Sequence, residues 1–157
     1  MGLARPLRVW LQTAIHRELM AHNFHKIWIH LIWTTKNREP LLEKEIRNRL
    51  FAHVKKHSIE QNLLVDSING IEDHVHCLVS LQPSMSVSEA VNLLKGESSH
   101  WINSEKFIEG QFSWQDGYGA FSVSDHFVEQ IRRYIRNQEE HHMQGSYLTD
   151  IKEFLKR

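Results

Sequence analysis

Two histidines separated by one valine, His74 and His76, stand in the stretch DHVHCLVSL, which otherwise has the composition of a buried β-strand. Side chains of a strand alternate between the two faces of its sheet, so both imidazoles project from the same face. Two imidazoles placed in this way can ligate one metal ion. A lone pair is a weak motif in a chain with 12 histidines, however, and a purely structural pair explains it at least equally well.

The stretch QIRRYIRNQEEHH supplies a candidate third ligand and a candidate nucleophile. Tyr134 and Gln138 are four residues apart, so they lie on one side of a helix, at the edge of its apolar stripe. A metal held by two imidazoles would satisfy the carbonyl oxygen of Gln138, and the phenol of Tyr134 can form a phosphodiester with a nucleic-acid phosphate. Because a phenol has an ordinary pKa of about 10, the ion would have to polarise the phosphate. The alternative for both residues is a place at the solvent boundary.

The elements that must position these groups follow from the spacing of apolar residues. Strand patterns occupy residues 24–35, 63–70 and 74–81, the last two joined into an antiparallel hairpin, and residues 112–123 form a further strand or an irregular extended segment. Helical patterns occupy residues 41–61 and 87–104. A last long helix is predicted from the serines Ser122 and Ser124 to about His142, with Phe127, Val128, Ile131 and Ile135 on its apolar side.

This order of elements predicts an α+β domain with the ferredoxin-like split βαβ (RRM-like) antiparallel sheet. Val75, Cys77, Val79 and Leu81 form an all-apolar row, which should meet the two crossover helices on one face. The additional C-terminal helix is then free to cover the other face, from which the histidines project. We expect an N-terminal extension over residues 1–20, the domain over 21–143 and a tail over 144–157.

Composition sets the broad class of the protein. The chain has 157 residues, 41% of them hydrophobic, which suits one globular domain. Nineteen basic side chains balance nineteen acidic ones, so the net charge gives no support for a nucleic-acid partner and does not exclude one. A single cysteine excludes an internal disulfide framework, and no apolar run approaches the roughly 18 residues of a membrane span. We therefore expect a cytoplasmic protein without a membrane partner.

From about residue 22 to 142 the chain resembles the single-tyrosine transposases of the insertion-sequence 200/605 type, within the histidine-hydrophobic-histidine (HUH) nucleases. The stretches that carry the resemblance are IHLIWTTKNREPLL, DHVHCLVSL, LLKGESS, GYGAFSVS and YIRNQEEHH. The resemblance implies that His74, His76 and Gln138 bind the metal ion and that Tyr134, on the C-terminal helix, is the nucleophile.

The resemblance also implies an activity. It predicts Mg²⁺- or Mn²⁺-dependent cleavage and strand transfer of single-stranded DNA through a 5′-phosphotyrosine intermediate, and hence DNA transposition. Such proteins are usually homodimers that recognise DNA hairpins near the ends of the element. Asp73 would orient a ligand histidine, although a plain turn residue is commoner. Further contacts to DNA are expected from Lys95, Gly96, Arg132, Arg133 and Arg136. The alternative for the three arginines is ordinary solvation at the surface.

Two other classes compete with this interpretation. A metallo-hydrolase would want an acidic residue and another histidine just after the pair, where the chain has Leu78 and Ser80, and a two-histidine phosphoesterase would want a second histidine motif on another strand. A non-catalytic hairpin-binding module derived from a transposase has no physical need for the tyrosine, both histidines and the glutamine together.

Overall fold

Four β-strands form one antiparallel sheet in the computed structural model, which describes residues 24–142. The strands lie in the order β2-β3-β1-β4. Their bounds are β1 Trp28–Thr34, β2 Leu64–Gly70, β3 His74–Ser80 and β4 Gly119–Val123. The central pair, β1 and β3, thus consists of strands far apart in the sequence, and the predicted split βαβ arrangement is confirmed.

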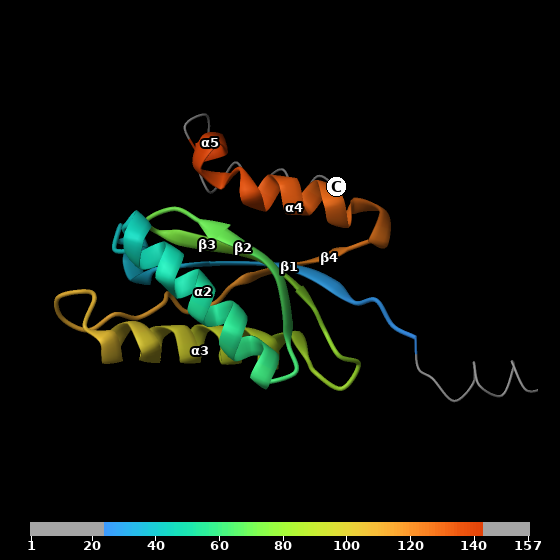
Figure 1. Cartoon of the computed structure of the whole chain (residues 1–157), viewed down its shortest axis with the longest axis horizontal. Helices are drawn as coiled ribbons and strands as arrows, with labels where there is room; N and C mark the ends of the chain where they lie inside the picture. Colours follow the sequence, from blue (N-terminus) through green and yellow to red (C-terminus); the bar gives the residue numbers. More distant parts are fainter. Residues whose placement is uncertain (1–23, 143–157) are drawn as a thin grey trace, which may run out of the picture.

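Helices cover both faces of the sheet (Figure 1). The crossover helices α2 (Lys44–Glu60) and α3 (Val87–Glu105) lie on one face, and α4 (Val128–Arg136) with the short α5 (Gln138–His142) lies on the other. Two short 3₁₀ turns complete the structure. The turn η1 (Lys36–Arg38) follows β1, and the turn η2 (Asp125–Phe127) precedes α4. The predicted extension and the tail beyond residue 143 lie outside the described residues.

The main core lies between the sheet and the two crossover helices. Leu31 and Trp33 of β1 share it with Val75, Cys77 and Val79 of β3, and buried residues of α2 and α3 pack on this row. A smaller cluster on the opposite face joins Leu78 to α4 through Val128, Ile131 and Ile135. The alternation of β3 therefore distributes its side chains between two cores, as the sequence predicted.

The start of α3 is fixed by its first residues. The Ser86 side chain accepts a hydrogen bond from the Glu89 backbone, and the Glu89 carboxylate accepts one from the Ser86 backbone. This reciprocal capping box satisfies two amides that the helix itself cannot. Gly96 lies inside α3, which continues through it without a break.

The C-terminal helical region differs from the single long helix that the sequence predicts. Ser122 belongs to β4, α4 begins only at Val128, and a non-helical Asn137 (φ −96°, ψ 22°) separates α4 from α5. Phe127 closes η2 and is 58% exposed rather than buried. A 3₁₀ turn has three residues per turn, so it places Phe127 out of phase with the buried stripe of α4.

Cys77 offers a direct test of the sheet's orientation. It is fully buried in the main core, and burial raises the pKa of its thiol. We expect the native protein to resist a colourimetric thiol reagent at mildly alkaline pH, and to release one equivalent of chromophore when guanidinium chloride unfolds it. Fast labelling of the native protein would mean that this row of β3 faces solvent.

No helix between residues 24 and 142 is long and apolar enough to cross a membrane.

Candidate active site

Strand β3 places His74 and His76 on the face that α4 covers. Both side chains are 0% exposed, and their ring centroids lie 5.2 Å apart at an interplanar angle of 70°. Leu78, the next residue of the same row, packs against α4. The two imidazoles are thus enclosed between the sheet and the C-terminal helices.

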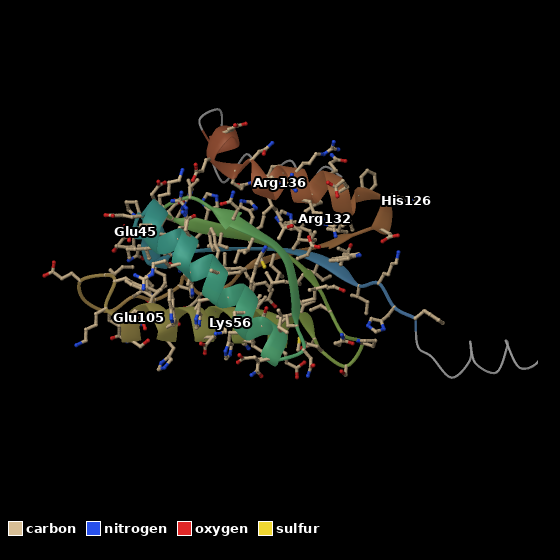
Figure 2. The ribbon with its side chains drawn as sticks, viewed as in Figure 1. Glu45, Lys56, Glu105, His126, Arg132 and Arg136 are labelled. Atoms are coloured by element: carbon tan, nitrogen blue, oxygen red, sulfur yellow. The ribbon has the colours of Figure 1, made fainter. Side chains whose placement is uncertain are left out.

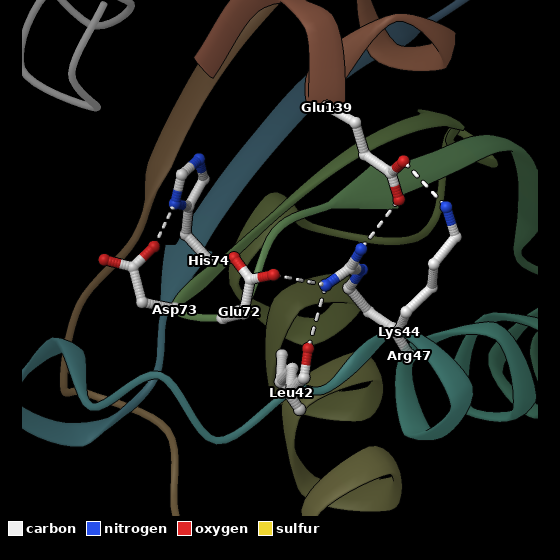
Figure 3. Close-up of polar contacts among 7 residues, drawn as sticks. All are labelled: Leu42, Lys44, Arg47, Glu72, Asp73, His74 and Glu139. Carbon is white, nitrogen blue, oxygen red and sulfur yellow. Dashed lines mark hydrogen bonds and ion pairs between the residues drawn. The ribbon is translucent and has the colours of Figure 1, made fainter. Parts of the chain in front are cut away.

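Asp73 fixes the orientation of the first histidine. Its carboxylate accepts a hydrogen bond of 2.6 Å from Nδ1 of His74 (Figure 3), and its other oxygen lies 2.8 Å from Arg38. Burial alone would raise the pKa of Asp73, but the hydrogen bond from His74 and the nearby guanidinium of Arg38 outweigh it and lower that pKa. An ionised Asp73 keeps the proton of His74 on Nδ1, so Nε2 offers its lone pair.

The turn that carries Arg38 is strained. Asn37 and Arg38 have φ angles of 53° and 58°, in the left-handed region that non-glycine residues avoid. Hydrogen bonds hold the turn in place: the Thr35 hydroxyl donates to the Glu39 carbonyl, and the Asn37 backbone donates to the Gln115 side chain. The turn in this conformation holds the guanidinium of Arg38 next to the carboxylate of Asp73.

The hairpin before His74 also requires close packing. Gly70 ends β2, and a Cβ at this position would collide with the backbone carbonyl oxygen of His74. Only glycine permits this approach without shifting the backbone that carries the first histidine.

Helix α4 is tied over the histidine end of the sheet. Asn69, the cross-strand neighbour of His76, donates from its side-chain amide to the Arg136 carbonyl at 2.9 Å. Arg132 donates two hydrogen bonds, of 2.9 and 2.7 Å, to the carboxylate of Asp66, which lies at the register shift in β2. These contacts bring the ring of Tyr134 to 5.5 Å from the ring of His76, nearly perpendicular at 77°.

Gln138 is buried rather than placed at the solvent boundary. It is 0% exposed, and its amide nitrogen donates to the Tyr134 carbonyl at 3.2 Å. Its oxygen Oε1 has no hydrogen-bond partner among residues 24–142. A buried carbonyl oxygen without a partner is costly, and a cation would satisfy it.

A charged cluster on α2 holds the start of α5 (Figure 3). Glu139 accepts from Arg47 at 2.7 Å and from Lys44 at 3.0 Å. The Arg47 side chain is 3% exposed and also donates to the Leu42 carbonyl, with Glu72 at 3.5 Å. Arg47 therefore connects the neighbour of Gln138 to the hairpin that precedes His74.

His30 of β1 is a residue of this site that the sequence interpretation missed. It is 0% exposed, and its Nε2 lies 3.1 Å from Nδ1 of His76. Its ring centroid lies 6.1 Å from that of Tyr134. The available signal was a histidine inside an apolar strand, which becomes informative only once β1 is known to pair with β3.

The five candidate DNA contacts divide between the two faces. Lys95 and Gly96 lie on α3, across the sheet from the histidines, and the Lys95 ammonium donates to the carbonyls of Gln115 and Gly117. Arg132 and Arg136 lie on α4 (Figure 2), where Arg132 is engaged by Asp66, while Arg133 and Arg136 are exposed beside Tyr134. Their contacts to DNA stay predictions.

Comparison with known proteins gives the class of the molecule. Residues 23–138 match the family described as "Transposase IS200 like". This match spans most of the chain and includes the whole sheet, the buried histidines and α4. The chain therefore belongs to the IS200-like transposase family.

Named relatives agree with this assignment. The chain is 28% identical over 119 residues to the ISDra2 transposase TnpA of Deinococcus radiodurans, covering 73% of this chain and 85% of that protein. It is 27% identical over 136 residues to the transposase for insertion sequence element IS200 of Salmonella typhimurium, covering 83% and 88%.

Solved structures share the fold. The crystal structure of a putative transposase from Deinococcus radiodurans matches with a TM-score of 0.60 and 28% identity, covering 74% of this chain and 93% of that one. A REP-associated tyrosine transposase bound to a REP hairpin matches with a TM-score of 0.52 over 74% of this chain and 67% of that one. At 13% identity, this second likeness concerns the fold alone.

Proposed function

We propose that this transposase is an HUH single-tyrosine enzyme, which cleaves single-stranded DNA and transfers the strand through a 5′-phosphotyrosine intermediate on Tyr134. The observation that carries the proposal is the position of the Tyr134 ring, 5.5 Å from His76, above a buried histidine pair. A phenol held beside the imidazole of His76, whose neighbour His74 shares the same strand face, is an arrangement suited to attack on a phosphate.

The residues present fit a divalent metal ion, Mg²⁺ or Mn²⁺. Nε2 of His74 and of His76 and Oε1 of Gln138 would hold it, and Oε1 is the buried oxygen that lacks a hydrogen-bond partner among the described residues. No cluster of three or more histidine, cysteine, aspartate and glutamate ligands occurs in residues 24–142, which favours an amide as the third ligand. Imidazole ligands favour Mn²⁺ over Mg²⁺. When bound, the ion would polarise the scissile phosphate.

The reaction is an exchange of phosphodiesters. The Tyr134 oxygen attacks the phosphorus and forms a new P–O bond, while the bond from phosphorus to the 3′ oxygen of the preceding nucleotide breaks. The phenolic proton passes to solvent water, and the leaving 3′ oxygen takes up a proton from solvent to become a hydroxyl. Attack by another 3′-hydroxyl on the phosphotyrosine reverses the step and joins the strands without an external energy source.

The DNA partner would be a single strand with hairpin ends, bound by a homodimer in the cytoplasm. Arg133 and Arg136, which are exposed and flank Tyr134 in the sequence, would hold the phosphate backbone next to the cut. Lys95 and Gly96 would contact DNA farther away, on the α3 side.

The test is strand cleavage on a denaturing gel. Single-stranded DNA from the flanks of the gene, labelled at either end, is incubated with the protein and Mn²⁺ or Mg²⁺. The proposal expects the 3′-labelled fragment to become attached to protein and the 5′-labelled fragment to be released with a free 3′-hydroxyl. Metal-independent binding of the same DNA without cleavage would favour the non-catalytic hairpin-binding module instead.

Asp73→Asn tests the support of the metal site. The variant removes the negative charge that holds the His74 proton on Nδ1, and the loss of such an outer partner typically costs about 10–100-fold in metal affinity. We expect weakening in that range for Mn²⁺ by isothermal titration calorimetry. Asp116→Asn, at an exposed position on a loop, is the matched control. Equal affinities of the two variants would remove Asp73 from the metal site.

A further inference from the structure

His30 of β1 lies next to His76, and the two side chains meet through one ring nitrogen each. Its Nε2 is 3.1 Å from Nδ1 of His76, and both side chains are completely buried. We propose that His30 is a positioning residue that fixes the tautomer of His76, so that Nε2 of His76 presents a lone pair to the metal ion. The inference rests on the proposed function in one respect, namely that His76 is a metal ligand.

The direction of the hydrogen bond between the two rings decides what His76 can do. When the proton of neutral His76 sits on Nδ1, it is donated to Nε2 of His30, and Nε2 of His76 is left as a lone pair. When His30 is the donor instead, Nδ1 of His76 accepts and Nε2 of His76 carries the proton, which prevents ligation. His30 must therefore act as the acceptor, with its own proton on Nδ1.

The surroundings of His30 suit a supporting role rather than ligation. No three of the histidine, cysteine, aspartate and glutamate side chains in the described part of the chain converge as metal ligands, so His30 does not join His74 and His76 as a third imidazole ligand. On β1 its cross-strand neighbours are Leu78 and Phe121. The Phe121 ring lies at 6.4 Å and the Tyr134 ring at 6.1 Å from the His30 ring. These neighbours surround the His30 ring and restrict its orientation.

The two ligand histidines would then have unequal support. Nδ1 of His74 donates to the carboxylate of Asp73, whereas Nδ1 of His76 donates to a neutral imidazole. A carboxylate is the stronger acceptor and makes its imidazole the more basic ligand. This arrangement keeps both His74 and His76 as the Nδ1–H tautomer, and only one negative charge, the Asp73 carboxylate, is needed to do so.

The first experiment is a nitrogen–proton correlation NMR spectrum of the metal-free protein, with ring nitrogens labelled and the His76 signals assigned by their loss in His76→Asn. We expect His76 as the Nδ1–H tautomer at mildly alkaline pH. This measurement needs no DNA and no activity. A wild-type spectrum that shows the Nε2–H tautomer overturns the inference even if the protein cleaves DNA. The Nδ1–H tautomer in a protein that does not cleave would leave the inference standing and remove the proposed function.

Two variants then separate a tautomer effect from general damage to the core. His30→Phe removes the acceptor, so His76 should lose its single tautomer and Mn²⁺ affinity should fall by about 10–100-fold. His30→Gln restores an acceptor oxygen and should recover part of both. His100→Gln, at an exposed position of α3, is the control. Retention of the Nδ1–H tautomer in a folded His30→Phe variant, or no recovery with His30→Gln, would contradict the inference; if neither variant folds, the wild-type spectrum decides.

Discussion

Replacement of Tyr134 by phenylalanine should abolish the covalent protein–DNA adduct while preserving the fold. The aromatic ring remains to pack beside Leu78, Val128, Ile131 and Ile135 in the cluster under α4, so only the attacking oxygen is lost. Removal of a nucleophile lowers the rate by several orders of magnitude, and we expect a decrease on the order of 10³-fold or more. Gel quantification of the adduct, with Mn²⁺ present, measures the effect.

Tyr118→Phe is the matched control for this prediction. The Tyr118 hydroxyl lies on the loop before β4, 3.2 Å from the Ser88 hydroxyl, and the side chain is 42% exposed. Its removal should leave the adduct unchanged. Persistence of the adduct in Tyr134→Phe would assign the nucleophile to another residue, and equal losses in both variants would point to a general effect of removing a phenol.

His76→Ala should have the second large effect, because it is expected to remove both metal binding and chemistry. Loss of a ligand should weaken Mn²⁺ binding by more than the roughly 10–100-fold typical of an outer partner such as Asp73. The variant should form no adduct at metal concentrations that saturate the wild type. Calorimetric titration with Mn²⁺ and the adduct assay, performed on the same sample, check both expectations.

The controls for His76→Ala distinguish a lost ligand from a lost fold. His100→Ala removes an exposed histidine of α3 and should change neither measurement. A chelator added to the wild type should reproduce the inactive state of His76→Ala, and fresh Mn²⁺ should reverse the chelator but not the variant. A folded His76→Ala protein that binds Mn²⁺ normally would remove this histidine from the metal site.

The sequence predicted best what depends on local periodicity. The alternation of β3 placed His74 and His76 opposite Cys77, and the structure has this arrangement because a strand has a period of two whatever surrounds it. The stripe of Ile131 and Ile135 likewise predicted the buried face of α4. The order of elements was then sufficient for the split βαβ topology.

Features that depend on distant segments could not be read in this way. His30 becomes part of the site only because β1 pairs with β3, and the Arg47–Glu139 ion pair joins residues 92 positions apart. Asparagine tolerates the left-handed conformation of Asn37, which a hydrogen bond to the distant Gln115 side chain holds, but arginine disfavours the same conformation at Arg38. The break at Asn137, which starts a new helix at Gln138, carries no proline or glycine signal in the sequence.

Mass spectrometry of the protein–DNA adduct identifies the residue that forms the covalent link, which we propose to be Tyr134. Trypsin cuts after Arg133 and Arg136, so the tyrosine falls in the short peptide 134–136. After nuclease trimming of the trapped complex, we expect this peptide to carry a nucleotide attached through a 5′-phosphate. A nucleotide on any other peptide, or no modified peptide despite metal-dependent cleavage, would contradict this proposal.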